Sequence, residues 1–161
     1  MNKQINIIKS NQRKILDDEE WSFIKNTEHY FNQSYYIKNI NDLDMKIKKL
    51  LYKMINTKLS GYKQQDKKNN KYVENDFINR VQTIELLNKS ESLCYYCKEI
   101  TVIFYENVRD SKQWTLDRID NNLGHNYNNV EICCLKCNVQ RKTMYHDRFL
   151  FSKEINIIKK E

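Results

Sequence analysis

Four cysteines are the residues whose type and spacing first point to chemistry. They form two C-x2-C pairs, Cys94/Cys97 and Cys134/Cys137. Each pair presents two thiolates from a tight turn, and two such pairs complete a tetrahedral site for Zn²⁺. Because four cysteines leave no open coordination position, this metal would be structural. The segment between the pairs is too short to bury a core of its own, so we expect it to fold around the metal.

The fifth cysteine, Cys133, precedes Cys134 on a segment expected to be extended, so its side chain points the opposite way and is expected in the core. The alternative interpretation is a set of disulfides in a secreted protein. An odd cysteine count, a Lys-rich chain and a start without a signal segment favour a reducing, intracellular compartment. We also expect no membrane span, because no apolar stretch is long enough.

Between the two cysteine pairs, the residue types change in a regular order. Residues 114–119 carry β-branched and aromatic side chains and are predicted to form a strand, and residues 130–133 a second one. The Asn-rich stretch 121–129 is predicted to be a loop, and the pattern becomes helical from Leu135. The predicted fold class is therefore α+β. Its core is a zinc-stapled strand–loop–strand–helix unit, preceded by two helices and followed by a C-terminal helix.

The runs L-D-R-I-D, G-H, N-V and C-x2-C-N within residues 92–150 resemble the HNH (His-Me finger) family of endonucleases. In that family a ββα-metal finger cleaves DNA. The resemblance is most specific for a sub-group found in genes of phages and large viruses. It implies a viral or mobile-element product that acts in the host cell or is packaged in a virion.

Position by position, the resemblance implies roles for individual residues. Asp117 and Asn138 fall on the family's two ligands for a catalytic divalent ion, and Asn129 falls on the Asn that shapes the loop. The four paired cysteines fall on the zinc knuckles of many members. Carboxylate and amide oxygens suit Mg²⁺ or Mn²⁺. The resemblance thus implies phosphodiester hydrolysis, with zinc as the structural metal and Mg²⁺ or Mn²⁺ as the catalytic one.

The chain departs from the family pattern at Arg118. The family usually has a His there, which acts as general base on the attacking water. An Arg stays protonated, so it can clamp the scissile phosphate but cannot take a proton. His125 is the first candidate to replace the base, because imidazole titrates near neutrality; Tyr127 and His146 are weaker candidates. The alternative for His125 is a loop residue that makes only local hydrogen bonds.

Basic residues exceed acidic ones, and the formal charge is +7. Such an excess favours a polyanionic partner, which the resemblance implies is duplex DNA. Between residues 46 and 71, nine lysines stand against a single acidic residue, Asp66. The alternative for such a run is a solvated helix face. Beside a nuclease finger, we expect phosphate contacts from Lys46, Lys49, Lys53, Lys63, Lys67, Lys68, Arg141 and Lys142.

The chain is predicted to have three segments. Residues 1–40 form a lead-in. Within it, residues 19–39 faintly resemble a module that precedes many HNH homing nucleases; the alternative is a short β-rich or irregular stretch. Residues 1–18, which include an apolar patch at 5–8, are predicted to be an edge strand or a loose arm. Residues 41–91 form a basic helical region, and residues 92–161 form the finger with its closing helix.

Apolar spacing predicts the helices of the second segment. Residues 43–59 show an apolar stripe at three- and four-residue steps, with Asn41 or Asp42 as cap and an end at Ser60-Gly61. Residues 62–72 are predicted to be a linker or a flexible helical extension. A second helix, capped by Asn75, leads to the first cysteine pair. Residues 100–105 are predicted to be a strand.

Two functions of different classes fit these features. The first is a metal-dependent DNA endonuclease of HNH type, which nicks or cuts both strands. The second is a catalytically inactive zinc-finger protein that binds nucleic acid and kept the fold after losing its base, as Arg118 indicates. Asp117 and Asn138 favour the first, because a purely structural finger needs no oxygen ligands at those places. Cutting both strands with one finger per chain requires a homodimer or two successive nicks.

Overall fold

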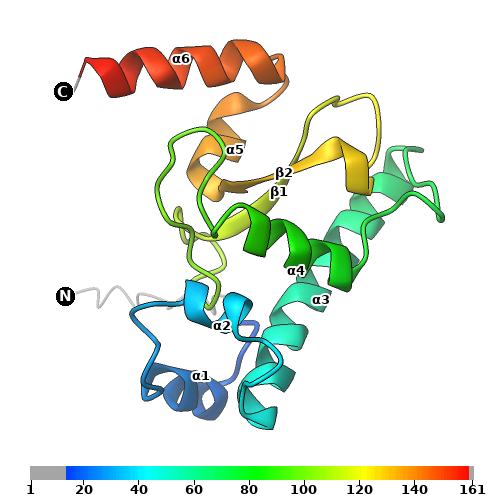
Figure 1. Cartoon of the computed structure of the whole chain (residues 1–161). Coiled ribbons are helices and arrows are strands. Elements are labelled where there is room, and N and C mark those ends of the chain that lie inside the picture. Colours follow the sequence, from blue (N-terminus) through cyan, green and yellow to red (C-terminus); the bar gives the residue numbers. More distant parts are fainter. Residues whose placement is uncertain (1–13, 160–161) are drawn as a thin grey trace, which may run out of the picture.

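Helices surround a single hairpin in the computed structural model, which describes residues 14–159 (Figure 1). Most of the predicted edge strand or arm, residues 1–18, lies outside this range. The mixture of helices with a small two-stranded sheet confirms the α+β class. In chain order the elements are α1 (Asp18–Lys25), α2 (Ser34–Lys38), α3 (Met45–Lys68), α4 (Arg80–Lys89), β1 (Trp114–Arg118), the 3-10 turn η1 (Tyr127–Asn129), β2 (Val130–Cys134), α5 (Leu135–Arg141) and α6 (His146–Ile158).

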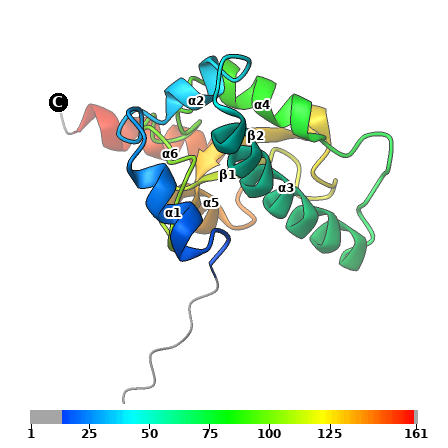
Figure 2. The ribbon, with the colours of Figure 1, turned by 90° about the horizontal axis from the view of Figure 1, so that it is seen from below.

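Strands β1 and β2 pair antiparallel, and their two faces meet different helices. Because neighbouring side chains on a strand point to opposite faces, Trp114 and Leu116 turn toward the main core shared with α3 and α4. Thr115 and Asp117 turn toward α5, whose side chains donate hydrogen bonds to them. Figures 1 and 2 show the hairpin between these two groups of helices.

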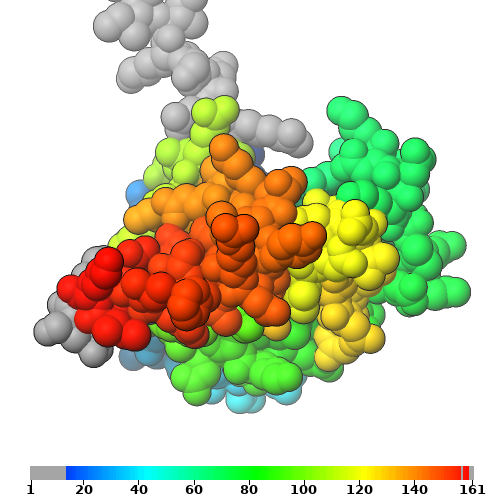
Figure 3. Space-filling model, turned by 90° about the horizontal axis from the view of Figure 1, so that it is seen from above, coloured from blue at the N-terminus to red at the C-terminus, as the bar shows by residue number. Residues whose placement is uncertain are grey.

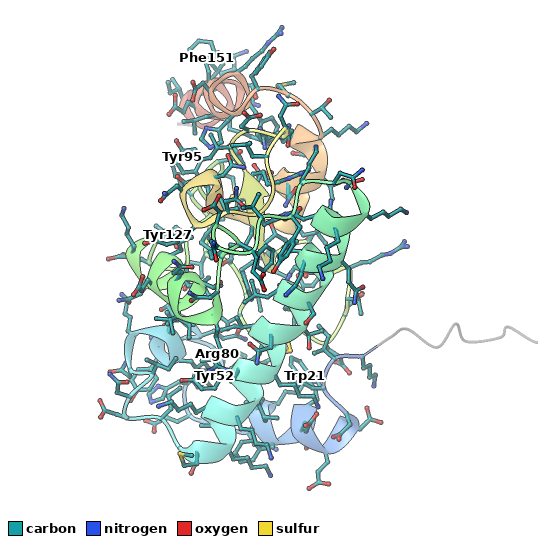
Figure 4. The ribbon with its side chains drawn as sticks, turned by 90° about the vertical axis from the view of Figure 1, so that its right-hand side faces the viewer. Trp21, Tyr52, Arg80, Tyr95, Tyr127 and Phe151 are labelled. Carbon is teal, nitrogen blue, oxygen red and sulfur yellow. The ribbon has the colours of Figure 1, made fainter. Side chains whose placement is uncertain are left out.

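The main core lies on the α3 side of the hairpin. The apolar stripe of α3 recurs at three- and four-residue steps and is buried along one face, as expected for an amphipathic helix. Arg80 at the start of α4 lies over Tyr52 of α3, with its guanidinium carbon 4.1 Å from the ring centroid (Figure 4). The stripe consists of Leu50, Leu51, Met54, Ile55 and Leu59.

The lead-in is helical, which corrects the expectation of a β-rich or irregular stretch. Asp17 begins α1 with a capping box, in which its side chain accepts from the Glu20 amide and the Glu20 carboxylate accepts from the Asp17 amide. Trp21 and Ile24 of α1 and Tyr36 of α2 then enter the same core as α3. Within residues 14–159, four helices precede the hairpin, where two were predicted.

Helix α3 begins later and ends later than predicted. Asp44 caps it by accepting from the Lys46 amide at 2.8 Å, and the helix passes through Gly61 to Lys68. A glycine inside a helix costs only about 1 kcal/mol relative to alanine, so tertiary contacts can override it. Those contacts come from Tyr62 and Asp66 in the last two turns, where a linker or flexible extension was predicted.

Two further expectations differ from the structure. Helix α4 starts after Asn79, which forms a capping box with Gln82, and not after Asn75. Residues 100–105 form isolated bridges and no strand. Their backbone finds a different partner, because the side-chain oxygen of Gln33 accepts from the amides of Ile103 and Phe104 at 2.8 and 2.7 Å.

Candidate active site and metal centre

The four paired cysteines meet at one point. Their sulfur atoms all lie within 4.8 Å of one another, and the Cys97 and Cys134 sulfurs are 3.9 Å apart. Four sulfurs bound tetrahedrally at about 2.3 Å from zinc would be about 3.8 Å apart. The cluster can therefore hold a metal ion such as zinc, as the spacing of the two pairs predicts.

Hydrogen bonds within the cluster shift its thiols in opposite directions, and a helix covers part of it. The pKa of Cys94 is lowered well below its usual range, because Cys134 and then Cys137 provide hydrogen bonds to its sulfur. The pKa of Cys137 is raised, because hydrogen bonds with Cys134 and Cys94, together with burial, favour its thiol form. Phe149 of α6 is buried in the same small core and meets Tyr96 edge-on, with ring centroids 4.8 Å apart. The closing helix thus contacts the cysteine knuckles through Phe149, whereas Phe151 and Ile158 on the same helix are exposed.

Cys133 lies apart from the cluster. Its sulfur is 3.2 Å from the hydroxyl of Thr115 on the adjacent strand, and burial raises the pKa of its thiol. The side chain is buried and belongs to the packing around the hairpin. This matches the prediction that it is a core residue.

The outer edge of β1 has no partner strand within residues 14–159, and side chains from both flanking helices bind its backbone. The Leu116 amide donates to the hydroxyl of Tyr62 on α3 at 3.1 Å. From α5, Arg141 donates to the Arg118 carbonyl at 2.5 Å and Asn138 lies 3.5 Å from the Leu116 carbonyl. Backbone groups of an edge strand need such partners, so this edge brings α3 and α5 to one place.

Asp117 is held firmly at this edge through one of its oxygens. Oδ2 accepts from the buried guanidinium of Arg141 at 2.9 Å and from the hydroxyl of Tyr96. Within the described residues, Oδ1 accepts no hydrogen bond from another side chain. The carboxylate is therefore oriented by two donors and keeps one oxygen available.

Arg141 does not occupy the position that the predicted nucleic-acid contact requires. Its side chain is 1% exposed, and it donates to Asp117, to the Arg118 carbonyl and to the Ile119 carbonyl at 3.0 Å. A guanidinium enclosed in this way cannot reach a phosphate. Its role is to hold Asp117 and the end of β1, which corrects the prediction.

Asn138 reaches the same edge from the first turns of α5. Its side-chain nitrogen donates to the hydroxyl of Thr115 at 3.1 Å, next to the weaker approach to Leu116. This contact fixes the orientation of the amide and leaves its oxygen without a hydrogen bond among the described residues. Asn138 thus keeps its amide oxygen for a ligand, and it lines the same small cavity as Asp117.

A small cavity of about 90 Å³ opens where β1, α3 and α5 meet. It brings together four of the five residues predicted to be catalytic, although they are spread over more than twenty positions of the sequence. The neighbours on α3 and after α5 were not predicted to lie at the site, apart from Lys142, which was predicted to contact nucleic acid. The lining residues are Tyr62, Gln65, Leu116, Asp117, Arg118, Asn121, His125, Asn138 and Lys142.

Arg118 lines the cavity, and among the described residues its guanidinium forms hydrogen bonds through one terminal nitrogen. One terminal nitrogen donates to the Leu123 carbonyl at 3.2 Å and lies 3.5 Å from the Asn121 carbonyl. A guanidinium carries five donors in a planar fork. The remaining donors are available to an anionic ligand in the cavity.

His125 is buried, and its contacts come from α3. The carboxylate of Asp66 accepts from the His125 backbone amide at 2.6 Å and lies 2.8 Å from ring atom Nδ1. The ring stacks on Tyr62 with centroids 4.3 Å apart. Burial lowers the pKa of His125, so the neutral imidazole is favoured. These contacts exceed the local loop bonds of the alternative interpretation.

Asp66 and Tyr62 are the residues that sequence reasoning missed. They are four positions apart on α3, so they lie on the same helix face, but the helix was predicted to end before them. One signal was present: Asp66 is the single acidic residue in a run of nine lysines. It is fully buried, so it is not part of a solvated face.

Asn129 holds the loop that carries His125. Its side-chain nitrogen donates to the carbonyls of Asp120 and Gly124 at 3.0 and 2.9 Å, and its oxygen accepts from the Asp120 amide at 2.9 Å. It does not line the cavity. The predicted loop-shaping role therefore agrees with its contacts.

The predicted DNA-contacting lysines divide into two groups along α3. Lys53 bonds the carboxylate of Glu20 at 2.6 Å, and Lys46 lies 4.1 Å from the centre of the Phe23 ring. Both are therefore engaged at the α1 end of the helix. The exposed Lys49 lies on that same half. Lys63, Lys67 and Lys68 lie on the last turns of α3, and the first two are 4.9 and 5.2 Å from the centre of the Tyr72 ring. Of the predicted basic contacts that remain, Lys142 after α5 lines the cavity.

The space-filling view shows the 120–130 loop side by side with residues 60–72 (Figure 3). Lys71 joins the two by donating to the Asn121 carbonyl at 2.5 Å. The two weaker candidates for a base lie apart from the cavity. Tyr127 is partly exposed on η1, and His146 stacks on Tyr95 with ring centroids 4.6 Å apart.

No helix within residues 14–159 combines the length and the apolar character that crossing a membrane requires. Comparisons of the chain with family models, with curated proteins and with solved structures find no match.

Proposed function

We propose that this chain is a metal-dependent endonuclease of HNH type that hydrolyses phosphodiester bonds of duplex DNA. One observation carries the proposal. Asp117 and Asn138 line one cavity together with His125, and each of the first two keeps an oxygen without a hydrogen bond among the described residues. A carboxylate oxygen and an amide oxygen beside an imidazole are the groups that metal-assisted hydrolysis needs.

The oxygen pair fits a hard divalent cation. Asp117 is already oriented by Arg141 and Tyr96, and Asn138 by Thr115, so neither ligand has to be ordered on binding. Mg²⁺ and Mn²⁺ prefer such oxygens and keep positions for water and phosphate. When bound, the cation would supply charge neutralisation at the phosphate oxygens.

The protein's own groups would then perform the proton transfer and the positioning. A water oxygen adds to the phosphorus, and the bond from phosphorus to one bridging oxygen breaks. Nε2 of His125 takes the proton that the water gives up, and the departing oxygen takes a proton from solvent. The free donors of Arg118, together with the ammonium group of Lys142, would hold the phosphate oxygens.

The four-cysteine cluster takes no part in this chemistry. With all four positions filled by sulfur, we propose that it holds Zn²⁺ and stabilises the fold that presents β1 and α5. One finger per chain cleaves one strand, so we propose nicking as the unit reaction. A double-strand break would need a second copy of the chain or a second nick.

A second function is favoured by a specific observation. Arg118 stands where the family's base is expected, and Asp117 is paired with a buried arginine, which competes with a cation for the same carboxylate. A zinc-stabilised nucleic-acid-binding protein without cleavage activity would keep both features. The lysines near the cavity would serve it equally well.

The experiment that separates the two is a plasmid-nicking assay with purified protein in Mg²⁺, Mn²⁺ or EDTA. The variants are Asp117→Asn and Asn138→Ala, and Gln140→Ala on the same helix is the matched control. Asn is preferred to Ala at position 117, because Ala would leave the buried Arg141 without its partner.

Cleavage should require the divalent metal. It should fall by more than about 10²-fold in both variants, since loss of even an outer-shell partner of a metal ligand costs 10–100-fold. Gln140→Ala should cleave normally. Absence of cleavage in every metal, with zinc bound and salt-sensitive DNA binding intact, would instead establish the binding protein.

A further inference from the structure

From the contacts of His125 we infer that Asp66 is a positioning residue, which makes α3 part of the active site. It would hold the imidazole in the tautomer whose Nε2 is a bare acceptor facing the substrate. The inference rests on the proposed endonuclease function. It adds a residue, and a helix outside the finger, to the catalytic machinery.

The hydrogen-bonding pattern defines the tautomer. An ionised carboxylate can only accept, and Asp66 is within hydrogen-bonding distance of both the backbone amide and Nδ1 of His125. Nδ1 must therefore carry the proton. Nε2 then keeps its lone pair, and within residues 14–159 no group hydrogen-bonds to it. This is the arrangement that a general base requires.

The ring is fixed in orientation as well as in tautomer. Tyr62 stacks on one face of the imidazole with an interplanar angle of 25°, and its hydroxyl is tied to the Leu116 amide of β1. Asp66 is 0% exposed, so its carboxylate is shielded from water that would weaken the bond. Gly124, directly before His125, allows the loop to approach Asp66 this closely.

A structural explanation alone accounts for less of this arrangement. A buried acid that only anchored the loop would be satisfied by the backbone amide of His125 through one oxygen. The second oxygen of the Asp66 carboxylate instead lies 2.8 Å from Nδ1 of the His125 ring, and His125 lines the same cavity as Asp117 and Asn138. The base that Arg118 cannot provide would thus come from the loop that Asp66 holds.

The first test reads the tautomer without any catalysis. Nitrogen-15 NMR of selectively labelled histidine in the zinc-loaded, magnesium-free protein near pH 7.5 should show His125 with protonated Nδ1 and unprotonated Nε2. In Asp66→Asn the population of this tautomer should fall, because an asparagine amide group cannot accept from both His125 donors. Detection of the Nε2–H tautomer in the wild-type protein would overturn the inference, and this measurement needs no variant to fold.

The second test measures nicking rates for Asp66→Asn, His125→Ala and the double variant. General bases contribute about 10² to 10⁴-fold, so we expect kcat to fall by about 10 to 10³-fold in Asp66→Asn at nearly unchanged KM. The double variant should be no slower than His125→Ala, because Asp66 acts through that ring. Gln64→Ala, at an exposed position of the same helix that does not line the cavity, is the matched control and should cleave at the wild-type rate.

The outcomes separate this inference from the proposed function. If Asp117→Asn abolishes nicking while Asp66→Asn and His125→Ala cleave at the wild-type rate, the positioning role is refuted and the endonuclease stands. A double variant that is slower than His125→Ala by the full Asp66 effect would also refute it. A wild-type protein that cleaves no DNA would refute both the endonuclease function and the positioning role of Asp66.

Discussion

The chain contains two glycines, and the structure predicts opposite effects for replacing each of them with alanine. At Gly124, an added Cβ would lie 2.8 Å from the carboxylate of Asp66, which is 0.6 Å short of ordinary contact. The carbonyl oxygen of Lys71 would lie closer still. At Gly61, in the middle of α3, an added Cβ meets nothing within 4 Å.

The loss of stability in Gly124→Ala can be worked out from the displacement of the loop that the added methyl group requires. The loop would have to withdraw from α3 by about 1 Å to remove both close approaches. The His125 amide, now 2.6 Å from the Asp66 carboxylate, would then leave hydrogen-bonding range, and Nδ1 would follow. Hydrogen bonds to a charged group are worth about 1.5–3 kcal/mol each, so loss of both in Gly124→Ala should lower the free energy of unfolding by about 3–6 kcal/mol.

Gly61→Ala should instead raise the free energy of unfolding by about 0.5–1 kcal/mol. Alanine removes the helix-interior penalty of glycine, and the backbone there needs no special conformation. Both variants add one methyl group to a glycine of the same chain, so each serves as the control for the other.

The assay is urea unfolding followed by circular dichroism, with thermal unfolding as a check. For a chain of this length about 2–4 °C corresponds to 1 kcal/mol, so the melting temperatures of the two variants should differ by roughly 10–20 °C. Equal unfolding midpoints for Gly124→Ala and the wild type would mean that the loop does not lie against α3. That result would also remove the basis for the contacts of His125.

Two further variants test the metal centre and a buried lysine. Cys137→Ser should lose zinc and unfold the finger, because structural zinc contributes about 10–16 kcal/mol in small zinc domains; Cys133→Ser, outside the cluster, should keep one zinc per chain by elemental analysis. Zinc retained in Cys137→Ser would contradict the assignment of that ligand. Burial lowers the pKa of Lys58 from 10.5 to about 7, although its ammonium group contacts Gln113 and lies near the rings of Tyr105 and Trp114. Between these pH values the unfolded chain binds the proton that the folded chain has lost, so stability should rise with pH, by at most about 1.4 kcal/mol per unit. Lys58→Met should flatten the slope of unfolding free energy between pH 7 and 9, and an unchanged slope would show that Lys58 stays charged in the fold.

Features that depend on local chemistry were readable along the chain. Two C-x2-C pairs specify a metal cluster wherever the chain brings them together, and the cysteine sulfurs do converge. The β-branched and aromatic residues of 114–119 and the segment 130–133 predicted the two strands that pair in the hairpin, and the apolar stripe of α3 predicted its buried face. Asp117 and Asn138 could be named as candidates because the resemblance to a family motif implies metal ligands at those positions, and His125 because an imidazole titrates near neutrality.

Contacts between distant segments could not be read in this way. Residue type alone favours an end of α3 at Gly61, and the packing of Tyr62 and Asp66 against the finger overrides that preference. Arg141 has the charge of a phosphate ligand, but the fold encloses it beside Asp117. In the same way, a single acid among lysines became the partner of His125. Helix preference and charge are properties of a residue, whereas burial and partners are properties of the folded chain, and the latter decided which groups face the cavity.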